Sequence, residues 1–317
     1  MSLIDLTKPR WDQNTYWGRA THFFHLTNPL NVLASDKQLD EAKKIVTEFR
    51  KTQKMPSGYD EEKLWAAKYL YDSAFHPDTG EKMILIGRMA AQAPMNTLIT
   101  GGMITFYRTT AATVFWQWLN QTFNAIVNYT NRGGDTPIPV SQMVASYCCA
   151  CGGALGTALY LNSKVKNMNP LFARFVPFAA VAGANCLNIP MMRSSEIING
   201  TPVFTLSGER IGESRNAARY GISLVVVSRI FMAIPGMILT PMATNFGLKR
   251  GWFRGGRHWL ILPFQLASVG FCVTIATPLG CAMFPQQATF PVSRLEPELA
   301  KIARSKNVDT VVYNKGL

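Results

Sequence analysis

The stretch that decides the fold is FVPFAAVAGANCLNIPMM, residues 175–192, which contains no charged residue and is long enough to enter a lipid bilayer. Proline donates no backbone hydrogen bond, so Pro177 and Pro190 each leave the carbonyl four positions earlier without its helical partner. The amides of Asn185 and Asn188 lie between these prolines and are costly in hydrocarbon unless they meet another helix, water or a substrate. Two interpretations stay open: a kinked helix joined to its neighbours by amide hydrogen bonds, or a substrate site in an interrupted helix.

The composition of the whole chain is that of a membrane protein. Of 317 residues, 48% are hydrophobic and 16% are charged, whereas soluble domains are about 25% charged. The formal net charge of +13 is spread over loops, where it suits anionic lipid headgroups, and no basic stripe interleaved with aromatic residues indicates a nucleic-acid partner. Asp5 and Asp12 stand in an N-terminus without an apolar core, so we expect neither a secretory signal nor an acid-poor transit peptide.

Apolar segments predict an all-α membrane protein with about five transmembrane helices in a domain covering residues 96–285. The expected spans are 96–118, 140–162, 172–192, 222–245 and 259–284. Several are broken by proline, and the predicted helix breaks are Pro177, Pro190, Pro235, Pro241 and Pro278. In the second span Gly152 and Gly156 are four residues apart, a spacing that lets helix backbones approach closely.

The two ends of the chain predict soluble parts. Residues 1–95 read as a small helical domain, with a capping box from Ser35 to Gln38 at the start of an amphipathic helix and a second helix near Asp60. A short hairpin is expected around residues 203–211, and residues 286–317 form a polar tail. Five crossings would place the N-terminal domain at the membrane end that holds residues 249–257, and the tail at the opposite end.

Metal and redox chemistry find little support in the sequence. Cys148 and Cys151 form a single C-x-x-C without a second pair or a nearby histidine, so we interpret the cysteines as small apolar packing residues. His76 and Asp78 stand in the turn HPDTGE and lack a third ligand at metal spacing. We therefore expect no metal, no cofactor and no enzymatic activity.

No Asp or Glu falls inside the five apolar segments, but Arg108 and Arg229 do. An intramembrane arginine without a carboxylate partner must find backbone carbonyls, water, headgroups or an anionic ligand. One interpretation is that each side chain extends to the interface, and the other is that it binds a substrate carboxylate. The missing carboxylates also remove the usual proton relay, which favours exchange or facilitated movement over proton-driven pumping.

Several separate motifs resemble the sideroflexin family. They occur in order along nearly the whole chain: HPDTGEKMILIGRM from His76, TFYRTT from Thr105, FWQWLNQTFNAIVNYTNR from Phe115, NCLNIPMMR from Asn185 and the terminal YNKGL. The chain is most similar to the serine-carrying branch. The resemblance implies a multi-pass protein of the mitochondrial inner membrane that moves serine, with alanine, cysteine or glycine as further substrates, into the matrix for one-carbon metabolism. It also implies links to iron and haem balance.

The preferred hypothesis is a carrier for a small zwitterion whose carboxylate meets Arg229 or Arg108 and whose polar groups meet Asn185 or Asn188. The lipid bilayer and small neutral amino acids are then its partners. The alternative is a non-transporting inner-membrane scaffold for respiratory or iron and haem machinery, with protein partners bound through the N-terminal domain. A tricarboxylate carrier is less favoured, because two arginines in separate spans are few for three carboxylates.

Overall fold

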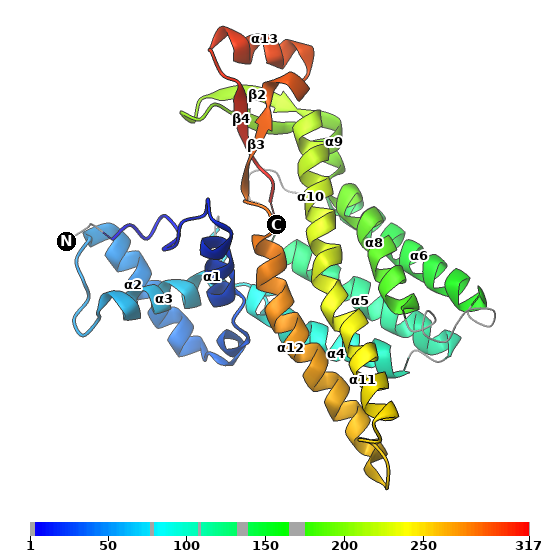
Figure 1. Cartoon of the computed structure of the whole chain (residues 1–317). Coiled ribbons are helices and arrows are strands. Elements are labelled where there is room, and N and C mark those ends of the chain that lie inside the picture. Colours follow the sequence, from blue (N-terminus) through cyan, green and yellow to red (C-terminus); the bar gives the residue numbers. More distant parts are fainter. Residues whose placement is uncertain (1–3, 77–78, 107–108, 132–138, 165–174, 317) are drawn as a thin grey trace. The chain divides into compact units, whose positions relative to one another are not determined.

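The computed structural model describes residues 4–76, 79–106, 109–131, 139–164 and 175–316. It is mostly helical with one small sheet, which confirms the helical membrane class (Figure 1). The chain divides into two compact units. The first comprises Met1–Pro137 and Pro235–Ala282, and the second comprises Ile138–Ile234 and Met283–Leu317.

The N-terminal part of the first unit is a small helical bundle. Its elements are α1 (Tyr16–Leu26), η1 (Pro29–Leu33), α2 (Asp36–Thr52) and α3 (Glu61–Ala74). The predicted capping box is present, because the Ser35 hydroxyl accepts from the Gln38 backbone N–H and the Gln38 side chain accepts from the Ser35 backbone N–H. Apolar residues at helical spacing on α2 and α3 meet in a buried cluster that includes Val46, Phe49 and Leu64.

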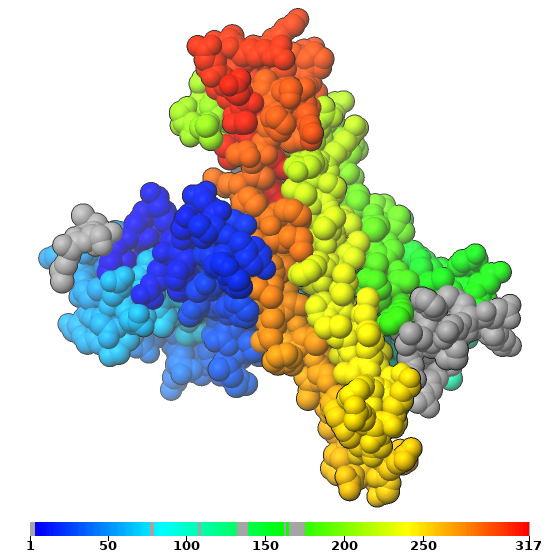
Figure 2. Space-filling model, viewed as in Figure 1, coloured from blue at the N-terminus to red at the C-terminus, as the bar shows by residue number. Residues whose placement is uncertain are grey.

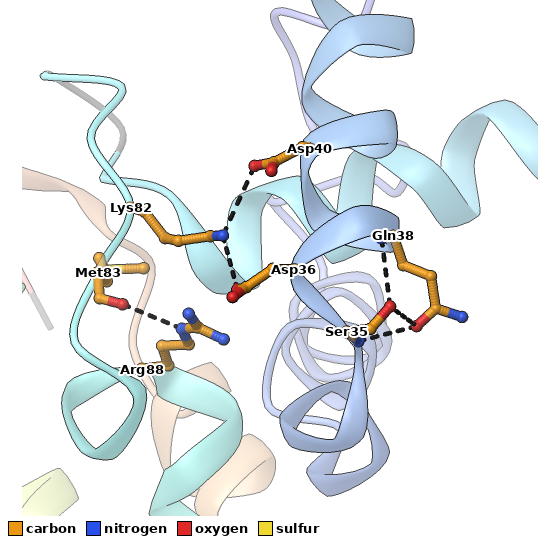
Figure 3. Close-up of polar contacts among 7 residues, drawn as sticks. All are labelled: Ser35, Asp36, Gln38, Asp40, Lys82, Met83 and Arg88. Carbon is orange, nitrogen blue, oxygen red and sulfur yellow. Dashed lines mark hydrogen bonds and ion pairs between the residues drawn. The ribbon is translucent and has the colours of Figure 1, made fainter.

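The segment that follows α3 is tied to the start of α2 (Figure 3). Lys82 Nζ donates to Asp36 Oδ1 at 2.7 Å and lies 3.5 Å from Asp40 Oδ1. Arg88 Nε donates to the Met83 carbonyl at 3.1 Å. Two short turns, η2 (Leu85–Gly87) and η3 (Met89–Ala91), complete the segment. Part of the HPDTGEK motif therefore closes the N-terminal bundle.

The stretch 96–118 does not form the single span that the sequence predicts. Instead α4 (Gln92–Phe106) ends, and α5 (Thr110–Thr130) starts with the Thr109 side chain accepting from the Ala112 backbone N–H. The two helices pack against each other, and Phe106 stacks on Trp116 with ring centroids 6.3 Å apart. At the other end of α5, Asn131 Nδ2 donates to the Gly87 carbonyl at 2.8 Å. The hairpin therefore returns the chain to the point where α4 begins.

The longest helix of the first unit, α12 (Ile261–Ala282), packs against α4 and α1. It follows η5 (Pro235–Leu239), α11 (Thr240–Lys249) and η6 (Arg257–Leu260). Its last carbonyls are held by the N-terminal bundle: the Tyr16 hydroxyl donates to Leu279 at 3.3 Å, and Arg19 Nε donates to Ala282 at 2.9 Å. Such donors satisfy the free carbonyls of a helix end and oppose its dipole. Figure 2 shows the N-terminal helices lying against α12.

These contacts place the N-terminal bundle at the opposite end of α12 from the end that the sequence predicts. At about 1.5 Å per residue, α12 separates its two ends by the thickness of a bilayer core. The N-terminal bundle contacts the Ala282 end, so it does not lie at the end that holds residues 249–257. The physical reason is the α4–α5 hairpin. A single span at 96–118 would have carried the chain across the membrane, whereas the hairpin brings it back to the side from which α4 begins.

The second unit begins with two antiparallel helices, α6 (Val140–Lys164) and α8 (Val176–Met192). Gln142 Nε2 donates to the Met192 carbonyl at 3.2 Å and to Ser194 Oγ at 2.8 Å, which joins the start of α6 to the end of α8. A short helix, α9 (Ser194–Asn199), follows, and α10 (Arg215–Ile234) then packs against α8.

Close approach of α6 and α8 occurs at a different glycine from those predicted. A Cβ atom on Gly153 would lie 2.3 Å from Leu187 Cδ1, so only glycine leaves room there for that side chain. At Gly152 and Gly156 such an atom would have no described neighbour within 4 Å. These two glycines lie on the exposed side of α6 in the single chain, so the predicted spacing motif does not pack α6 on α8.

The structure contains a four-stranded antiparallel sheet that the predicted all-α fold does not include. Part of the predicted polar tail forms two of its strands. The strands are β1 (Thr201–Phe204), β2 (Arg210–Ser214), β3 (Gln287–Pro291) and β4 (Thr310–Asn314), in the order β2-β1-β4-β3, with α13 (Pro297–Ser305) between β3 and β4. The expected hairpin forms β1 and β2. Alternate residues of the strands, among them Val203, Val311 and Tyr313, face a common buried cluster. The tail therefore folds onto the connector that precedes α10.

Three helical segments of the described residues are long and apolar enough to cross a membrane, namely Val140–Leu161, Arg215–Lys249 and Arg257–Ala282. α8 is apolar but shorter. Pro177 and Pro241 occupy the first turns of α8 and α11, where the missing N–H is not needed, so Pro177 begins a helix instead of breaking one. Pro190 and Pro278 lie inside helices, and Pro235 begins the π-helical turn η5.

Candidate functional site

Three of the four predicted substrate-binding residues lie on two helices that pack against each other, α8 and α10. Ile189 of α8 packs with Ile222 and Val225 of α10, and the two helices run antiparallel (Figure 1). Asn185 lies one turn before Ile189, and Arg229 lies one turn after Val225. The two helices are antiparallel, so moving one turn back along α8 and one turn forward along α10 leads in the same direction by the same distance. Asn185 and Arg229 therefore lie at a similar height along the helix pair. The fourth predicted residue, Arg108, lies outside the described residues, as does Asp78.

The polar groups of this pair are buried to different degrees. Asn188 is 5% exposed, and Asn185 is half-buried. The sequence reasoning missed Ser228, which is also 5% exposed and whose Oγ has no hydrogen-bond partner among the described residues. Its signal was available, since it is a hydroxyl beside Arg229 in an apolar helix. A buried hydroxyl without a partner carries a desolvation cost, so a ligand or a water molecule would stabilise it.

Arg229 is the half-buried cation of this pair, and it takes part in none of the ion pairs formed among the described residues. The carboxylate that follows α8, Glu196, is engaged by Arg193 through two contacts of 2.5 and 2.7 Å. Neither α8 nor α10 contains Asp or Glu. An anionic group reaching Arg229 would therefore meet no competing carboxylate from these two helices.

A second polar row, on α5, was not predicted. Its members are buried and three or four residues apart along one face: Thr113, Gln117, Asn120 and Gln121. The signal lay in the sequence, because amides recur at helical spacing between aromatic residues, but this stretch was divided between a predicted span and a loop. The prolines of α12 and α11 belong to the same unit as this row.

Metal chemistry finds no donor set in the described residues, where no group of three or more His, Cys, Asp or Glu side chains is arranged to hold an ion. His76 is buried in the turn after α3, with its backbone N–H donating to the Glu81 carbonyl at 2.9 Å. Cys148 and Cys149 are exposed on α6, and Cys151 is half-buried. His76 therefore takes part in the turn through its backbone, whereas the exposed Cys148 and Cys149 are not buried packing residues in the single chain.

The fold and the polar groups define a class: a helical membrane protein with uncharged amides and hydroxyls buried in apolar helices. Comparison with known proteins narrows it. The family model of the sideroflexins matches residues 5–317. The chain is 55% identical to human Sideroflexin-1, 56% to Sideroflexin-3 of Rattus norvegicus and 55% to Sideroflexin-1-3 of Drosophila melanogaster, in each case over 99% of this chain and 98% of the relative. The chain belongs to the sideroflexin family. No solved structure matches it.

Proposed function

We propose that this protein is a carrier of the mitochondrial inner membrane that moves serine, and with it alanine, cysteine or glycine, into the matrix to supply one-carbon metabolism. The proposal rests on the family and on one structural observation, the uncharged polar groups of the α8–α10 pair together with its half-buried Arg229. It makes the protein a transporter and not an enzyme. A small neutral amino acid carries one carboxylate and one ammonium, which fits one arginine better than a tricarboxylate does.

In this proposal the substrate carboxylate binds Arg229 and its polar side chain binds the amides beside it. A guanidinium presents parallel donors to a carboxylate, which fixes orientation as well as charge. Asn185, Asn188 and the unpartnered Ser228 hydroxyl then serve the ammonium and the serine hydroxyl. The carbonyl that Pro190 leaves free on α8 offers a further acceptor.

The test is uptake of radiolabelled serine into proteoliposomes that contain the purified full chain, with alanine and citrate as competitors. We expect saturable uptake that alanine blocks and citrate does not. Arg229→Gln should reduce kcat/KM by about tenfold or more, because a hydrogen bond to a charged group contributes about 1.5–3 kcal/mol. Asn188→Ala should reduce it less, as expected for a neutral hydrogen bond.

The matched control is Arg219→Gln, which removes the same charge from an exposed position of α10 and should leave uptake unchanged. If correctly folded wild-type protein moves no serine above empty liposomes, the carrier proposal is wrong. If serine uptake survives Arg229→Gln at the wild-type rate, the carboxylate does not bind at α10.

A scaffold role is the second candidate, because the N-terminal bundle exposes large apolar side chains. Trp17 is 72% exposed, Leu30 is 68% exposed and Leu33 is 79% exposed, all on α1 and η1. A surface of this kind suits a protein partner or the membrane interface. Deleting the apolar groups with Trp17→Ser and Leu33→Ser separates the two roles: a carrier keeps its transport in liposomes, whereas a scaffold loses assembly partners in cells and moves nothing.

A further inference from the structure

We propose that the buried amides of α5 form a binding site for a small solute without net charge, with Gln121 and Asn120 as its direct hydrogen-bonding groups. The inference rests on the proposed carrier function and adds a site in the first unit, separate from the α8–α10 residues of the second. Three observations carry it: the exposed aromatic side of α5, the unsatisfied amide atoms on its buried face, and the uncharged sequences of α5 and of α4, which packs against it.

The faces of α5 are reversed relative to a helix of a soluble protein. Its exposed side carries Val114, Phe115 and Trp118, which are 39%, 48% and 46% exposed. Its buried residues are mostly amides and hydroxyls, with Phe123 and Val127 toward the C-terminal half. In a soluble protein the amides would face water and the aromatic residues would face the core. The reversed pattern is typical of a helix in lipid whose polar side faces the interior of a transport protein.

The amides on the buried side lack partners. Gln121 is 1% exposed, and both its Oε1 and its Nε2 have no hydrogen-bond partner among the described residues. Asn120 is 6% exposed, and its Nδ2 has none either. Leaving a buried amide unpaired costs about 1–3 kcal/mol, and buried polar atoms in folded proteins are almost always paired. Three unpaired atoms on adjacent residues therefore point to a polar ligand or its replacement water.

An amide of the same unit shows the contrasting arrangement. Gln265 of α12 is 7% exposed, and its Oε1 accepts from the Thr105 hydroxyl of α4 at 2.8 Å. This bond joins α4 to α12 and leaves that Gln265 oxygen satisfied within the protein. Gln121 is as deeply buried and has no such bond, so helix packing does not account for it. Gln265 is thus a structural amide, and it provides the matched control for Gln121.

The chemistry of the surrounding helices determines the class of ligand. α5 and α4, which packs against it, contain no Asp, Glu, Lys or Arg, and the buried Arg88 that follows η2, the turn also packed on α5, donates to the Met83 carbonyl. An ion with net charge would lose its hydration there without a counter-charge, whereas a zwitterion or a neutral polyol satisfies both donors and acceptors. An amide offers one carbonyl and one NH₂ group, which suit an ammonium or hydroxyl on one side and a carboxylate on the other. The site therefore favours small neutral amino acids and disfavours citrate and metal ions.

The experiment measures stability and transport on the same purified full-length variants. Gln121→Met keeps the length of the side chain and removes its hydrogen bonds, and Gln265→Met makes the same change at the structural amide. For Gln121→Met we expect an unchanged or higher melting temperature without solute, and a smaller serine-induced thermal shift than in the wild type, because only the α8–α10 residues then bind serine. Its KM for serine should rise about tenfold or more, since hydrogen bonds to a charged group are removed. For Gln265→Met we expect a lower melting temperature and a retained serine-induced shift.

The outcomes distinguish this site from the carrier function itself. If wild-type protein shows neither serine uptake nor a serine-induced shift, the proposed function is wrong and the ligand of α5 with it. If wild-type protein transports serine and Gln121→Met does so with the same KM and thermal shift, only the α5 site is wrong. If Gln121→Met lowers the melting temperature as much as Gln265→Met and keeps the shift, the α5 amide is structural.

Discussion

Glu296 closes the start of α10 from 81 residues further along the chain. Its Oε1 accepts from the backbone N–H groups of Arg215 and Asn216 at 2.9 Å each, and its Oε2 accepts from the Ser214 hydroxyl at 2.8 Å. Burial alone would raise the pKa of this carboxyl, but these hydrogen bonds outweigh it and lower the pKa. A carboxylate at a helix N-terminus also opposes the helix dipole. The Glu296 carboxylate therefore attaches the C-terminal segment to the start of α10, beside the bond from Asn216 Nδ2 to the Arg294 carbonyl.

We predict that Glu296→Gln weakens this attachment by about 1–3 kcal/mol, because charge-assisted hydrogen bonds are lost. The lowered pKa of the folded state means that the wild-type contribution is present above the usual value of 4.5 and disappears as the pH falls through the folded pKa. Hydrogen exchange of β4 and of the first turn of α10, measured between neutral and acidic pH, checks both statements. Glu298→Gln, at an exposed position of α13, is the control, and equal exchange in the two variants would contradict the prediction.

At the scale of an element, two adjacent glycines of α4 let it pack closely against both α12 and α5. Gly101 and Gly102 are both buried. A Cβ on Gly101 would lie 2.5 Å from Leu266 Cδ2 of α12, and a Cβ on Gly102 would lie 2.1 Å from Trp116 Cη2 of α5. Glycine in a helix interior is intrinsically unfavourable by about 1 kcal/mol relative to alanine. Close packing on both sides therefore outweighs helix propensity here.

The matched test is alanine at Gly102 and at Gly152. Gly102→Ala should lower the melting temperature, because the indole of Trp116 must move and the α4–α5 hairpin opens. Gly152→Ala should leave it unchanged or raise it, since it adds helix propensity where no described atom lies within 4 Å. The prediction fails if the two substitutions have the same effect in purified protein.

At the scale of the whole molecule, the α4–α5 hairpin and the contacts of Arg19 place the N-terminal bundle at the Ala282 end of α12, within the first unit. Arg19 is 8% exposed, and besides Ala282 it donates to the carbonyls of Gln13 and Asn14 at 2.9 and 3.1 Å. The N-terminal bundle is thus bound to the end of α12, and β3 begins five residues after that end. The loop between α11 and α12 lies at the other end of the helix.

We predict that the N-terminal bundle and the C-terminal tail are exposed on the same side of the membrane. Protease sites inserted between α2 and α3, at residues 53–59, and at Asn307 between α13 and β4 should be cut from that side. A site inserted at residues 251–255 should be cut only from the opposite side. If the first two sites are cut from opposite sides, this prediction is wrong and the chain crosses the membrane once at 96–118, as the sequence predicts.

The sequence by itself determined the class of protein, the family and the local elements. Uncharged apolar runs, the capping box at Ser35 and the hairpin around residues 203–211 depend on neighbours within a few residues, so their patterns are readable without tertiary information. The same is true of Asn185 and Asn188, which stand out as amides in an apolar run. Whether they bind substrate stays a prediction.

Only the tertiary structure decided how these pieces pair. The return of α5 to Gly87, the docking of Arg19 on α12 and the fold of the tail onto β1 each join residues far apart in the chain. The polar row of α5 also needed it: burial turned Gln121 from an ordinary amide in an aromatic stretch into an unsatisfied one. A hydropathy pattern averages over all faces of a helix, and only packing shows which face is buried.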